Sequence, residues 1–267
     1  MIQVAKAHAY GNDFLFVPLE ALRASGSGLP DLARAMCHRH NGIGADGLIV
    51  YGLRPSGATM ELLNADGSAS ELSGNGLRCL AALVARDQKL RPPAIVTVDT
   101  DAGVKQLDLL DITAGRYAFR AALGQPTDVR KVEIPVLGEV VMASVLGMGN
   151  PQCVVLGDLP DHQRFSQLGR ALATHEMFPA GTNVEFAKVV SLTRVEILIW
   201  ERGVGPTTSS GTGASASAVA AAAHGGAARD VQVIAPGGSQ RVEWRDDGVH
   251  LTGWAEIVME GFWILNS

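Results

Sequence analysis

The 267-residue sequence contains few cysteines and no cluster of positive charge. Its three cysteines, Cys37, Cys79 and Cys153, are odd in number and scattered, so they fit neither a disulfide framework nor a zinc-binding spacing. A reducing compartment is the simplest environment for them, and we expect the protein in the cytoplasm. Because the formal net charge is −5 and no run of lysine and arginine occurs, neither nucleic acid nor an anionic membrane surface is expected as the main partner.

Long apolar runs and metal-ligand spacings are also missing. No apolar run reaches the roughly 18 residues of a membrane span, and residues 1–6 lack the charged and apolar regions of a secretory signal. The seven histidines form no recognisable ligand spacing, so we expect no metal. With 47% hydrophobic and 18% charged residues, the chain is typical of a globular protein with one large or two medium domains.

A short glycine-rich sequence occurs twice. Residues 73–79 read Ser-Gly-Asn-Gly-Leu-Arg-Cys and residues 210–216 read Ser-Gly-Thr-Gly-Ala-Ser-Ala, and each leads into an alanine-rich segment that favours a helix. The N-terminus of a helix attracts anions because its first N–H groups lack partners and carry partial positive charge. The repeat therefore indicates two halves of similar plan that hold one small anion. An N-cap followed by a turn is the simpler explanation of either copy alone.

The remaining chain predicts mostly strands, with one long apolar helix in each half. We therefore predict an α+β (mixed α/β) fold of two related domains. The first contains residues 1–118 and 255–267, because the apolar C-terminal residues are expected to return to it, and the second contains residues 119–254. The expected helices are 31–39, 74–86, 163–173 and 212–223. The expected strands are 2–7, 14–19, 48–51, 60–63, a run from 95 to about 120, and then 132–146, 154–156, 183–187, 194–200, 231–234, 241–245 and 249–258.

Asparagines recur in glycine-containing turns at the ends of predicted strands. They are Asn12, Asn64, Asn75, Asn150 and Asn183. A carboxamide donates and accepts hydrogen bonds without carrying charge, so it suits a zwitterionic ligand that resembles an amino acid. The alternative is that each asparagine only favours its turn. A charged pair, Glu201 and Arg202, follows an apolar strand, where it forms either an exposed ion pair or contacts to the ammonium and carboxylate of a ligand.

Eight segments, in the same order, resemble the cofactor-independent diaminopimelate epimerase family over essentially the whole chain. They are Gly11-Asn12-Asp13-Phe14, Gly42-Ile43-Gly44-Ala45-Asp46-Gly47, Asn64-Ala65-Asp66-Gly67-Ser68, Ser73-Gly74-Asn75-Gly76-Leu77-Arg78-Cys79, Gly149-Asn150-Pro151, Asn183-Val184-Glu185-Phe186, Glu201-Arg202-Gly203-Val204-Gly205 and Ser210-Gly211-Thr212-Gly213-Ala214. The resemblance implies two pseudo-symmetric domains, each a curled β-sheet around a central helix, with the ligand in the cleft between them. It also implies inversion at the α-carbon of diaminopimelate, in lysine and cell-wall biosynthesis, without pyridoxal phosphate or another cofactor. A homodimer is the assembly that it makes reasonable.

The resemblance further implies a mechanism in which one cysteine of each domain acts on the α-carbon. One thiolate removes the α-proton, and the opposite thiol delivers a proton to the other face. A helix N-terminus lowers the pKa of such a thiol, and its N–H groups hold the α-carboxylate of the substrate. The positions that match this carboxylate site are Gly74, Asn75, Gly211 and Thr212. The positions that match contacts to the remaining polar groups are Asn12, Asn64, Asn150, Asn183, Glu201 and Arg202.

The sequence departs from the family pattern at the two proton-transfer positions, which are Ser73 and Ser210 instead of cysteine. Gln152 stands where the family commonly carries histidine, and Pro206 stands where an acidic residue is frequent. A serine hydroxyl is a far weaker acid than a thiol and is normally inactive without an adjacent base. Glu201 is available as a base on one side only, and none of the three cysteines occupies a matching position.

Three functions remain open at this point. The first is an amino-acid epimerase of the diaminopimelate type that uses the two serines. The second is a related isomerase or racemase that removes a proton from one face of another small amino acid. The third is a non-catalytic protein that kept the carboxylate site and binds an amino acid. Exchange of the α-proton separates them, because it occurs with inversion in the first, stereospecifically in the second and not at all in the third.

Overall fold

The computed structural model describes residues 1–22, 28–70 and 73–264. The chain forms two compact units, Met1–Ala121 with Gly253–Ser267, and Ala122–Thr252. The sequence had placed the boundaries after residues 118 and 254. Both boundaries fall inside strands, β8 (Arg116–Gly124) and β17 (Gly248–Trp263), so the chain passes from one unit to the other in extended conformation each time.

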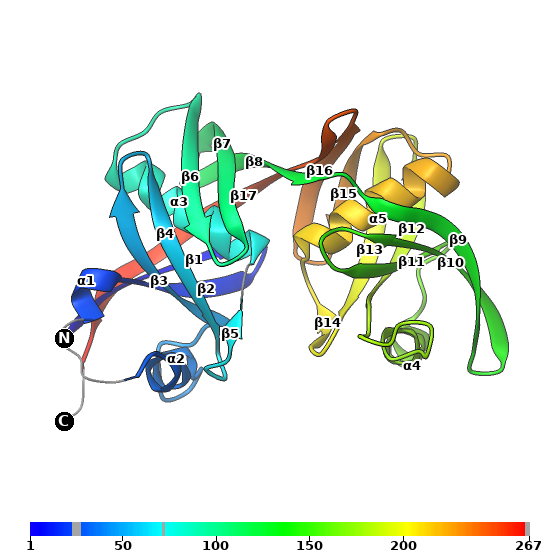
Figure 1. Ribbon diagram of the computed structural model, residues 1–267, viewed down its shortest axis with the longest axis horizontal. Coiled ribbons are helices and arrows are strands. Elements are labelled where there is room, and N and C mark those ends of the chain that lie inside the picture. Colours follow the sequence, from blue (N-terminus) through cyan, green and yellow to red (C-terminus); the bar gives the residue numbers. More distant parts are fainter. Residues whose placement is uncertain (23–27, 71–72, 265–267) are drawn as a thin grey trace. The chain divides into compact units, whose positions relative to one another are not determined.

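The first unit is built on a sheet that combines antiparallel and parallel pairs. Besides parts of β8 and β17, it contains β1 (Ile2–Ala9), β2 (Asn12–Pro18), β3 (Gly47–Arg54), β4 (Gly57–Asn64), β5 (Ala69–Ser70), β6 (Ala94–Thr100) and β7 (Gly103–Thr113). The pairs β2–β3 and β4–β6 are parallel, and the pairs β1–β2, β3–β4, β4–β5, β6–β7 and β7–β8 are antiparallel. Strand β17 pairs with β1, so the two ends of the chain share this sheet (Figure 1).

The hairpin between β1 and β2 shows how local chemistry sets the sheet. Its two turn residues, Tyr10 and Gly11, have φ angles of 57° and 88°. A two-residue hairpin turn with positive φ at both positions matches the right-handed twist of the strands, and glycine adopts this conformation without a steric cost. The turn places Asn12 at the first position of β2, directly opposite Ala9.

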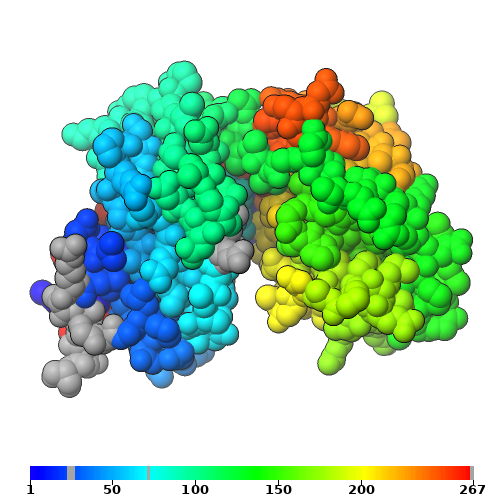
Figure 2. Space-filling model, viewed as in Figure 1, coloured from blue at the N-terminus to red at the C-terminus, as the bar shows by residue number. Residues whose placement is uncertain are grey.

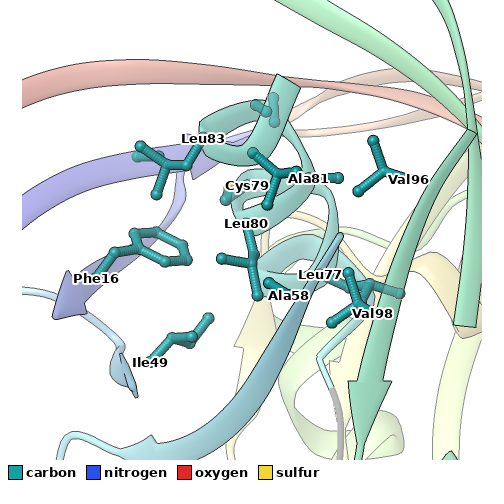
Figure 3. Packing of buried hydrophobic residues seen from close by; sticks show 14 of the residues in the cluster. Phe16, Ile49, Ala58, Leu77, Cys79, Leu80, Ala81, Leu83, Val96 and Val98 are labelled. Carbon is teal, nitrogen blue, oxygen red and sulfur yellow. The ribbon is translucent and has the colours of Figure 1, made fainter. Parts of the chain in front are cut away.

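Helix α3 (Gly74–Asp87) fills the core on one face of this sheet. Every residue from Asn75 to Ala85 is buried, so the helix is covered on all sides. Its alanines favour the helix and let the surrounding strands approach it closely. Figure 3 shows side chains of the helix and of the strands that pack against it, which are Leu77, Cys79, Leu80, Ala81 and Leu83 with Phe16, Ile49, Ala58, Val96 and Val98.

A second, amphipathic helix, α2 (Leu29–Cys37), covers part of the opposite face. Strand β2 separates the two cores by alternation, because successive side chains point to opposite faces of a sheet. Phe14 and Phe16 belong to the core around α3, whereas Leu15 and Val17 pack in the core that includes α2. The short helix α1 (Leu19–Leu22) follows β2 directly.

The second unit repeats this order of elements. Its strands, besides the remainder of β8 and β17, are β9 (Thr127–Val136), β10 (Glu139–Gly147), β11 (Pro151–Leu156), β12 (Asn183–Ser191), β13 (Arg194–Glu201), β14 (Gly205–Thr207), β15 (Asp230–Ala235) and β16 (Gly238–Arg245). The pairs β11–β12 and β13–β15 are parallel, as are their counterparts β2–β3 and β4–β6. Sequence of elements and direction of pairing thus match between the units.

The second unit also contains one helix that is buried on all sides and one that is buried on a single side. Helix α5 (Gly211–His224) is buried from Gly213 to Ala221 and packs with the core that contains Val154 and Val233. Helix α4 (His162–Ala173) buries only one side, with Phe165, Leu168 and Leu172 directed to a separate core. Figure 1 shows α5 enclosed by the strands of its unit, as α3 is in the first.

The four predicted helices and the predicted strands are confirmed, with differences at their ends. The helix expected at 31–39 begins at Leu29, because Pro30 is tolerated in the first turn, and it ends at Cys37. The strand expected to reach residue 19 ends at Pro18, which cannot donate to a strand ladder, and α1 starts at the next residue. The short strands β5 and β14 had not been expected, because two or three residues carry no periodic pattern.

The turn between β16 and β17 lies on the surface of the second unit. The side-chain Nε2 of Gln125 donates to the carbonyl oxygen of Asp246 at 2.7 Å, which ties this turn to the chain that follows β8. Figure 2 shows the two segments in orange-red and green beside each other. Among the described residues, no helix is long and apolar enough to cross a membrane.

Candidate active site

Ser73 is the N-cap residue of α3. Its backbone is extended, and its Oγ accepts a hydrogen bond from the N–H of Gly76 at 3.1 Å. Its carbonyl oxygen accepts the first helical bond, from Leu77, at 2.8 Å. Serine is favoured here because its hydroxyl satisfies a donor that the helix leaves unpaired. The N-cap interpretation of this serine is therefore confirmed, and its hydroxyl lies at the first turn of the helix.

Ser210 has the same position on α5. Its Oγ accepts from the N–H of Gly213 at 3.1 Å, and its carbonyl oxygen accepts from Ala214 at 3.0 Å. The hydroxyl also lies 3.4 Å from Oγ1 of Thr212. The two copies of the glycine-rich sequence thus form the same capped helix start in each unit.

Each capped helix leaves two first-turn N–H groups without an acceptor in the helix. The serine hydroxyl takes the third donor and the serine carbonyl takes the fourth, so the first and second remain. They are Gly74 and Asn75 in α3, and Gly211 and Thr212 in α5. These N–H groups carry the positive end of the helix dipole, which favours an anion. The sequence assigned the same four residues to a ligand carboxylate, and that assignment stays a prediction.

In the first unit, the side chains of Asn12 and Asn75 meet at the N-terminus of α3. Nδ2 of Asn75 donates to Oδ1 of Asn12 at 3.1 Å, and Nδ2 of Asn12 donates to Oδ2 of Asp46 at 2.7 Å. Asp46 is held in turn by Arg39 at 2.8 Å. Both carboxamides therefore bond within the protein, and the backbone N–H of Asn75 is the donor that this arrangement offers to a ligand.

Asn64, the last residue of β4, closes its own turn. Its Nδ2 donates to Oγ of Ser68 at 2.9 Å, as the turn interpretation of this asparagine predicts. The next residue, Ala65, donates its N–H to the carbonyl oxygen of Asp46 at 3.1 Å, so the turn adjoins the Asp46 loop. Among the described hydrogen bonds, none joins the side chain of Asn64 to Asn12 or Asn75.

In the second unit, the register of two strands gathers a polar group. Gln152 of β11 lies opposite Asn183 of the parallel strand β12. Nε2 of Gln152 lies 2.5 Å from Oδ1 of Asn150, and Oδ1 of Asn183 accepts from the backbone N–H of Arg202 at 2.8 Å. The structure therefore brings Asn150, Asn183 and the backbone of Arg202 together around Gln152.

Glu185 is a buried acid that the sequence analysis did not single out. Its side chain has no exposed surface, and it lies against the first turn of α5, where a Cβ atom on Gly213 would be 2.6 Å from Oε1. In the opposite orientation of the Gln152 carboxamide, its nitrogen faces Glu185 and donates to the two carboxylate oxygens, at 3.0 and 3.2 Å. Burial, and then the charge of Glu201, raise the pKa of Glu185 well above its ordinary value.

The sequence contained one indication that the side chain of Glu185 is directed into the protein. Its neighbours Val184 and Phe186 both pack in the core that includes α4. Alternation along β12 therefore directs Glu185 to the other face, toward α5. A charged residue at the middle of an apolar strand is the pattern that marks a buried acid.

Glu201 ends strand β13, as Asn64 ends the corresponding strand β4, and Arg202 is the next residue. Glu201 is half-buried, and its charge acts on Glu185. Arg202 is exposed, and its Nη1 donates to the carbonyl oxygen of Ala180 at 2.9 Å. Glu201 and Arg202 therefore lie at the edge of the polar group around Gln152, and Glu201 brings a negative charge to that edge.

The three cysteines offer no reactive thiol. All are buried, and burial is the main cause that raises the pKa of Cys37, Cys79 and Cys153 to about 12 in each case. A thiol with such a pKa stays protonated near neutral pH and is a poor base or nucleophile. Within the described part of the chain, no three histidine, cysteine or acidic side chains are grouped as metal ligands.

Solved structures that share this fold include racemases and epimerases. A predicted epimerase from Pseudomonas aeruginosa superposes with a TM-score of 0.74 at 14% identity, covering 100% of both chains. A probable proline racemase from Agrobacterium radiobacter superposes with a TM-score of 0.72 at 16% identity, covering 100% of this chain and 94% of that one. The protein therefore has the two-unit, sheet-rich fold of this class.

Relatives with higher sequence identity show the family to which the chain belongs. The family model for diaminopimelate epimerase matches residues 4–126 and 144–261. The diaminopimelate epimerase of Desulforudis audaxviator is 41% identical over 286 residues, covering 98% of this chain and 99% of that protein. That of Desulfitobacterium hafniense is 37% identical, covering 97% of each. The chain belongs to the diaminopimelate epimerase family and, with it, to the isomerases, which confirms the resemblance found in the sequence.

Proposed function

We propose that the protein interconverts LL- and meso-diaminopimelate, with Ser73 and Ser210 at the two proton-transfer positions. The observation that carries the proposal is the pair of serine-capped helices, α3 and α5, at equivalent places in two units of the same topology. Membership of the diaminopimelate epimerase family supports the choice of substrate. We call the N-terminal turn of α3 half-site 1 and that of α5 half-site 2.

The half-sites bind the α-carboxylate and stabilise the charge that forms during the reaction. Gly74 and Asn75 offer two N–H groups in half-site 1, and Gly211 and Thr212 offer two in half-site 2. When the α-proton leaves, negative charge spreads onto the carboxylate, and donors already oriented toward it lower the barrier. The remaining polar groups of the substrate are assigned to Asn12, Asn64, Asn150, Asn183, Glu201 and Arg202.

Proton transfer requires both half-sites to act on one α-carbon. One serine acts as its alkoxide, having first lost its hydroxyl proton to water. Its oxygen takes the α-proton, so a C–H bond breaks, an O–H bond forms, and this serine becomes a neutral hydroxyl. The hydroxyl of the other serine gives its proton to the opposite face of the carbanion, so that its own O–H bond breaks. The N–H groups of Gly76 and Gly213, which already donate to the two hydroxyl oxygens, stabilise the negative charge left on either oxygen.

A second candidate function is amino-acid binding without catalysis. Both serine oxygens already serve as N-caps, and the three thiols are buried and protonated. A serine is a weak acid and needs an adjacent base, and each tenfold loss of rate adds about 1.4 kcal/mol to the barrier. This second function keeps the carboxylate site and loses only the proton transfer.

Exchange of the α-proton tests the two functions. The protein is incubated in D2O with LL- and with meso-diaminopimelate, and the α-proton signal and the stereochemistry are followed by NMR. We expect deuterium incorporation together with interconversion, and loss of both in Ser73→Ala and in Ser210→Ala. No exchange above buffer, at high protein concentration over days, contradicts the epimerase function, and a ligand-induced rise in Tm would then favour binding alone.

Restoring the family residues provides a matched comparison. The double variant Ser73→Cys with Ser210→Cys places a more acidic group at each helix N-terminus, where the dipole lowers the pKa of a thiol. We expect it to exchange the α-proton at least a hundredfold faster than the wild type, corresponding to about 2.7 kcal/mol of barrier. A double variant as slow as the wild type would show that the half-sites do not hold the substrate as proposed.

The compartment and the assembly are further parts of the proposal. Three buried, unpaired thiols are compatible with the reducing cytoplasm, and a homodimer is the assembly that the family resemblance makes reasonable. Light scattering of the purified protein measures the assembly directly. A mass of twice 28.0 kDa is the expected result, and a mass of 28.0 kDa would rule out the dimer under those conditions.

A further inference from the structure

Arg78 is a buried arginine close to half-site 1. Its side chain is 2% exposed, and it lies in the second turn of α3. Its Nη2 donates to Oδ1 of Asn75, one turn earlier, in the direction in which helical side chains point. Its Nε is buried without a hydrogen-bond partner. Among the described residues, no carboxylate lies within ion-pairing distance of this guanidinium.

An unpaired buried charge is costly. A charged group that leaves water loses its hydration, and the loss is normally offset by an opposite charge or by a full set of hydrogen bonds. Burial is accordingly the largest cause that lowers the pKa of Arg78. Arginine nevertheless remains protonated in proteins, so the positive charge stays in the core. A residue that costs stability in this way is expected where function needs its charge.

The side chain is held in one position. The guanidinium lies 5.9 Å from the centre of the Tyr10 ring, within the range of a cation–π contact. On the other side, a Cβ atom on Gly253 would be 3.2 Å from its Nε and 3.1 Å from the Tyr10 hydroxyl. Strand β17 approaches this closely only because residue 253 has no side chain. The charge is thus fixed relative to the first turn of α3.

Arg78 is also the last member of a chain of side-chain hydrogen bonds. Arg39 donates to Asp46, Asn12 donates to Asp46, Asn75 donates to Asn12, and Arg78 donates to Asn75. Three segments of the family resemblance, which contain Asn12, Asp46 and Asn75, are therefore joined through side chains. Because Asn75 is bonded at both ends of its carboxamide, its side chain is held in one orientation at the first turn of α3.

Half-site 2 lacks this charge. The residue five positions after Ser73 is Arg78, and the residue five positions after Ser210 is Ser215. Ser215 is fully buried and its hydroxyl has no partner, so the space is used by a small neutral group. The buried ionisable group next to half-site 2 is Glu185, an acid. The two half-sites therefore differ in charge although their backbones match.

We propose that Arg78 is the positioning residue of half-site 1, which fixes Asn75 and supplies the positive charge that holds the substrate carboxylate there. The inference rests on the proposed function for the identity of the ligand. The carboxylate is a counter-charge for the guanidinium, which has none among the described residues. The charge acts through Asn75 and the helix end, so Arg78 itself touches no reacting atom. Half-site 1 consequently contributes more to carboxylate affinity than half-site 2.

The test compares four variants by isothermal titration with meso-diaminopimelate. Arg78→Met removes the charge and keeps much of the length, and Arg78→Lys keeps the charge and loses the planar fork. Ser215→Ala is the matched variant at the same position of α5. Arg86→Met removes one positive charge from the other end of α3, where Arg86 pairs with Asp87 and Glu260. Tm of each variant is measured without ligand.

We expect affinity to fall at least tenfold in Arg78→Met and less in Arg78→Lys, with both control variants within about twofold of the wild type. Without ligand, we expect Arg78→Met to have a Tm no lower than the wild type, because an unpaired buried charge has been removed. This combination separates a role in the site from a role in stability, since a purely structural arginine would lower Tm and leave affinity unchanged.

The opposite results overturn the inference. Wild-type affinity in Arg78→Met, or equal losses in Arg78→Met and Ser215→Ala, would show that the charge does not serve half-site 1. If Arg78→Met does not fold, Arg78 is a structural residue and the inference is also overturned. A wild-type protein that binds no diaminopimelate would instead contradict the proposed function, so the two failures are distinguishable.

Discussion

Gly213 is the residue at which helix α5 meets the buried acid Glu185. A Cβ atom here would lie 2.6 Å from Oε1 of Glu185 and 3.2 Å from Oγ of Ser210. By contrast, a Cβ atom on Gly74, the first residue of α3 in half-site 1, would have no heavy atom within 4 Å. The two glycines, at different positions of the repeated Ser-Gly-x-Gly sequence, therefore have different surroundings: Gly213 lies against a buried carboxyl group, and Gly74 faces open space.

This difference predicts opposite effects of two alanine substitutions. Gly213→Ala forces the carboxyl of Glu185 to move and is expected to lower the free energy of unfolding by about 1–3 kcal/mol. Gly74→Ala meets open space and is expected to change it by no more than about 1 kcal/mol, in the stabilising direction. Urea denaturation of both variants provides the measurement. Equal destabilisation would show that the contact at Gly213 is absent.

Glu185 predicts a pH dependence of stability with an unusual sign. Its folded pKa is raised above 4.5, so between 4.5 and the folded pKa the folded state binds more protons than the unfolded state. Stability from this residue is therefore present below pH 4.5 and is lost as pH rises through the folded pKa. Relative to Glu185→Gln, the wild type is expected to lose up to about 1.4 kcal/mol per pH unit in this window.

Urea denaturation between pH 5 and pH 8 measures the trend. The control variant is Glu139→Gln, which changes an exposed glutamate that pairs with Arg164 on the surface. Its difference from the wild type is expected to stay nearly constant over the same range. A constant difference for Glu185→Gln as well would mean that Glu185 is ionised in the folded protein throughout.

At the scale of elements, the two serines stabilise their helices whatever their part in proton transfer. Substituting an N-cap serine by alanine costs about 1 kcal/mol, and substituting it by glycine costs only a few tenths. We expect these losses for Ser73 and Ser210, measured by chemical denaturation. Asp161 caps α4 in the same way, through a bond from Arg164 at 2.8 Å, and lies outside both half-sites.

Asp161→Ala is therefore the control for function. It should lose as much stability as Ser73→Ala while keeping α-proton exchange at the wild-type rate. If Asp161→Ala lost exchange as well, the loss in Ser73→Ala would have to be attributed to stability. The glycine variants of the two serines give a second separation, because they keep most of the stability and lack the hydroxyl.

At the scale of the whole molecule, the first unit depends on both ends of the chain. Strand β17 pairs with β1 from Ile2 to His8, and Ala255 is fully buried in the core around α3. The backbone N–H of Trp254 donates to the hydroxyl of Tyr10 at 3.1 Å. The residues that follow Thr252 are thus a structural part of a unit that begins at residue 1.

Ending the chain at Thr252 is therefore expected to prevent folding of the first unit. The β1 edge would lose its partner, and buried apolar surface would be exposed to water. Rapid proteolysis within residues 1–121 and loss of α-proton exchange are the expected results. Phe262→Asp, which changes an exposed residue of the same strand, is expected to fold normally. A stable first unit in the shortened protein would contradict this account.

The sequence by itself determined the features that depend on near neighbours. The four long helices, the Ser73 and Ser210 caps and the Tyr10–Gly11 turn follow from residues within one turn of helix or one hairpin. The repeated order of motifs was sufficient to identify the family. Such features can be predicted from the sequence because a few neighbouring residues decide backbone conformation and capping.

Only the tertiary structure decided which charges are buried and what they face. Asn75 and Asn12 are 63 residues apart, and Asn12 and Asp46 are 34 apart, so their contacts depend on strand pairing. Arg78 looked like an ordinary member of a helix, and for Glu185 the alternation along β12 indicated only the face of the strand on which it lies. The burial of both side chains follows from the assembled core, which is built from segments far apart in the sequence.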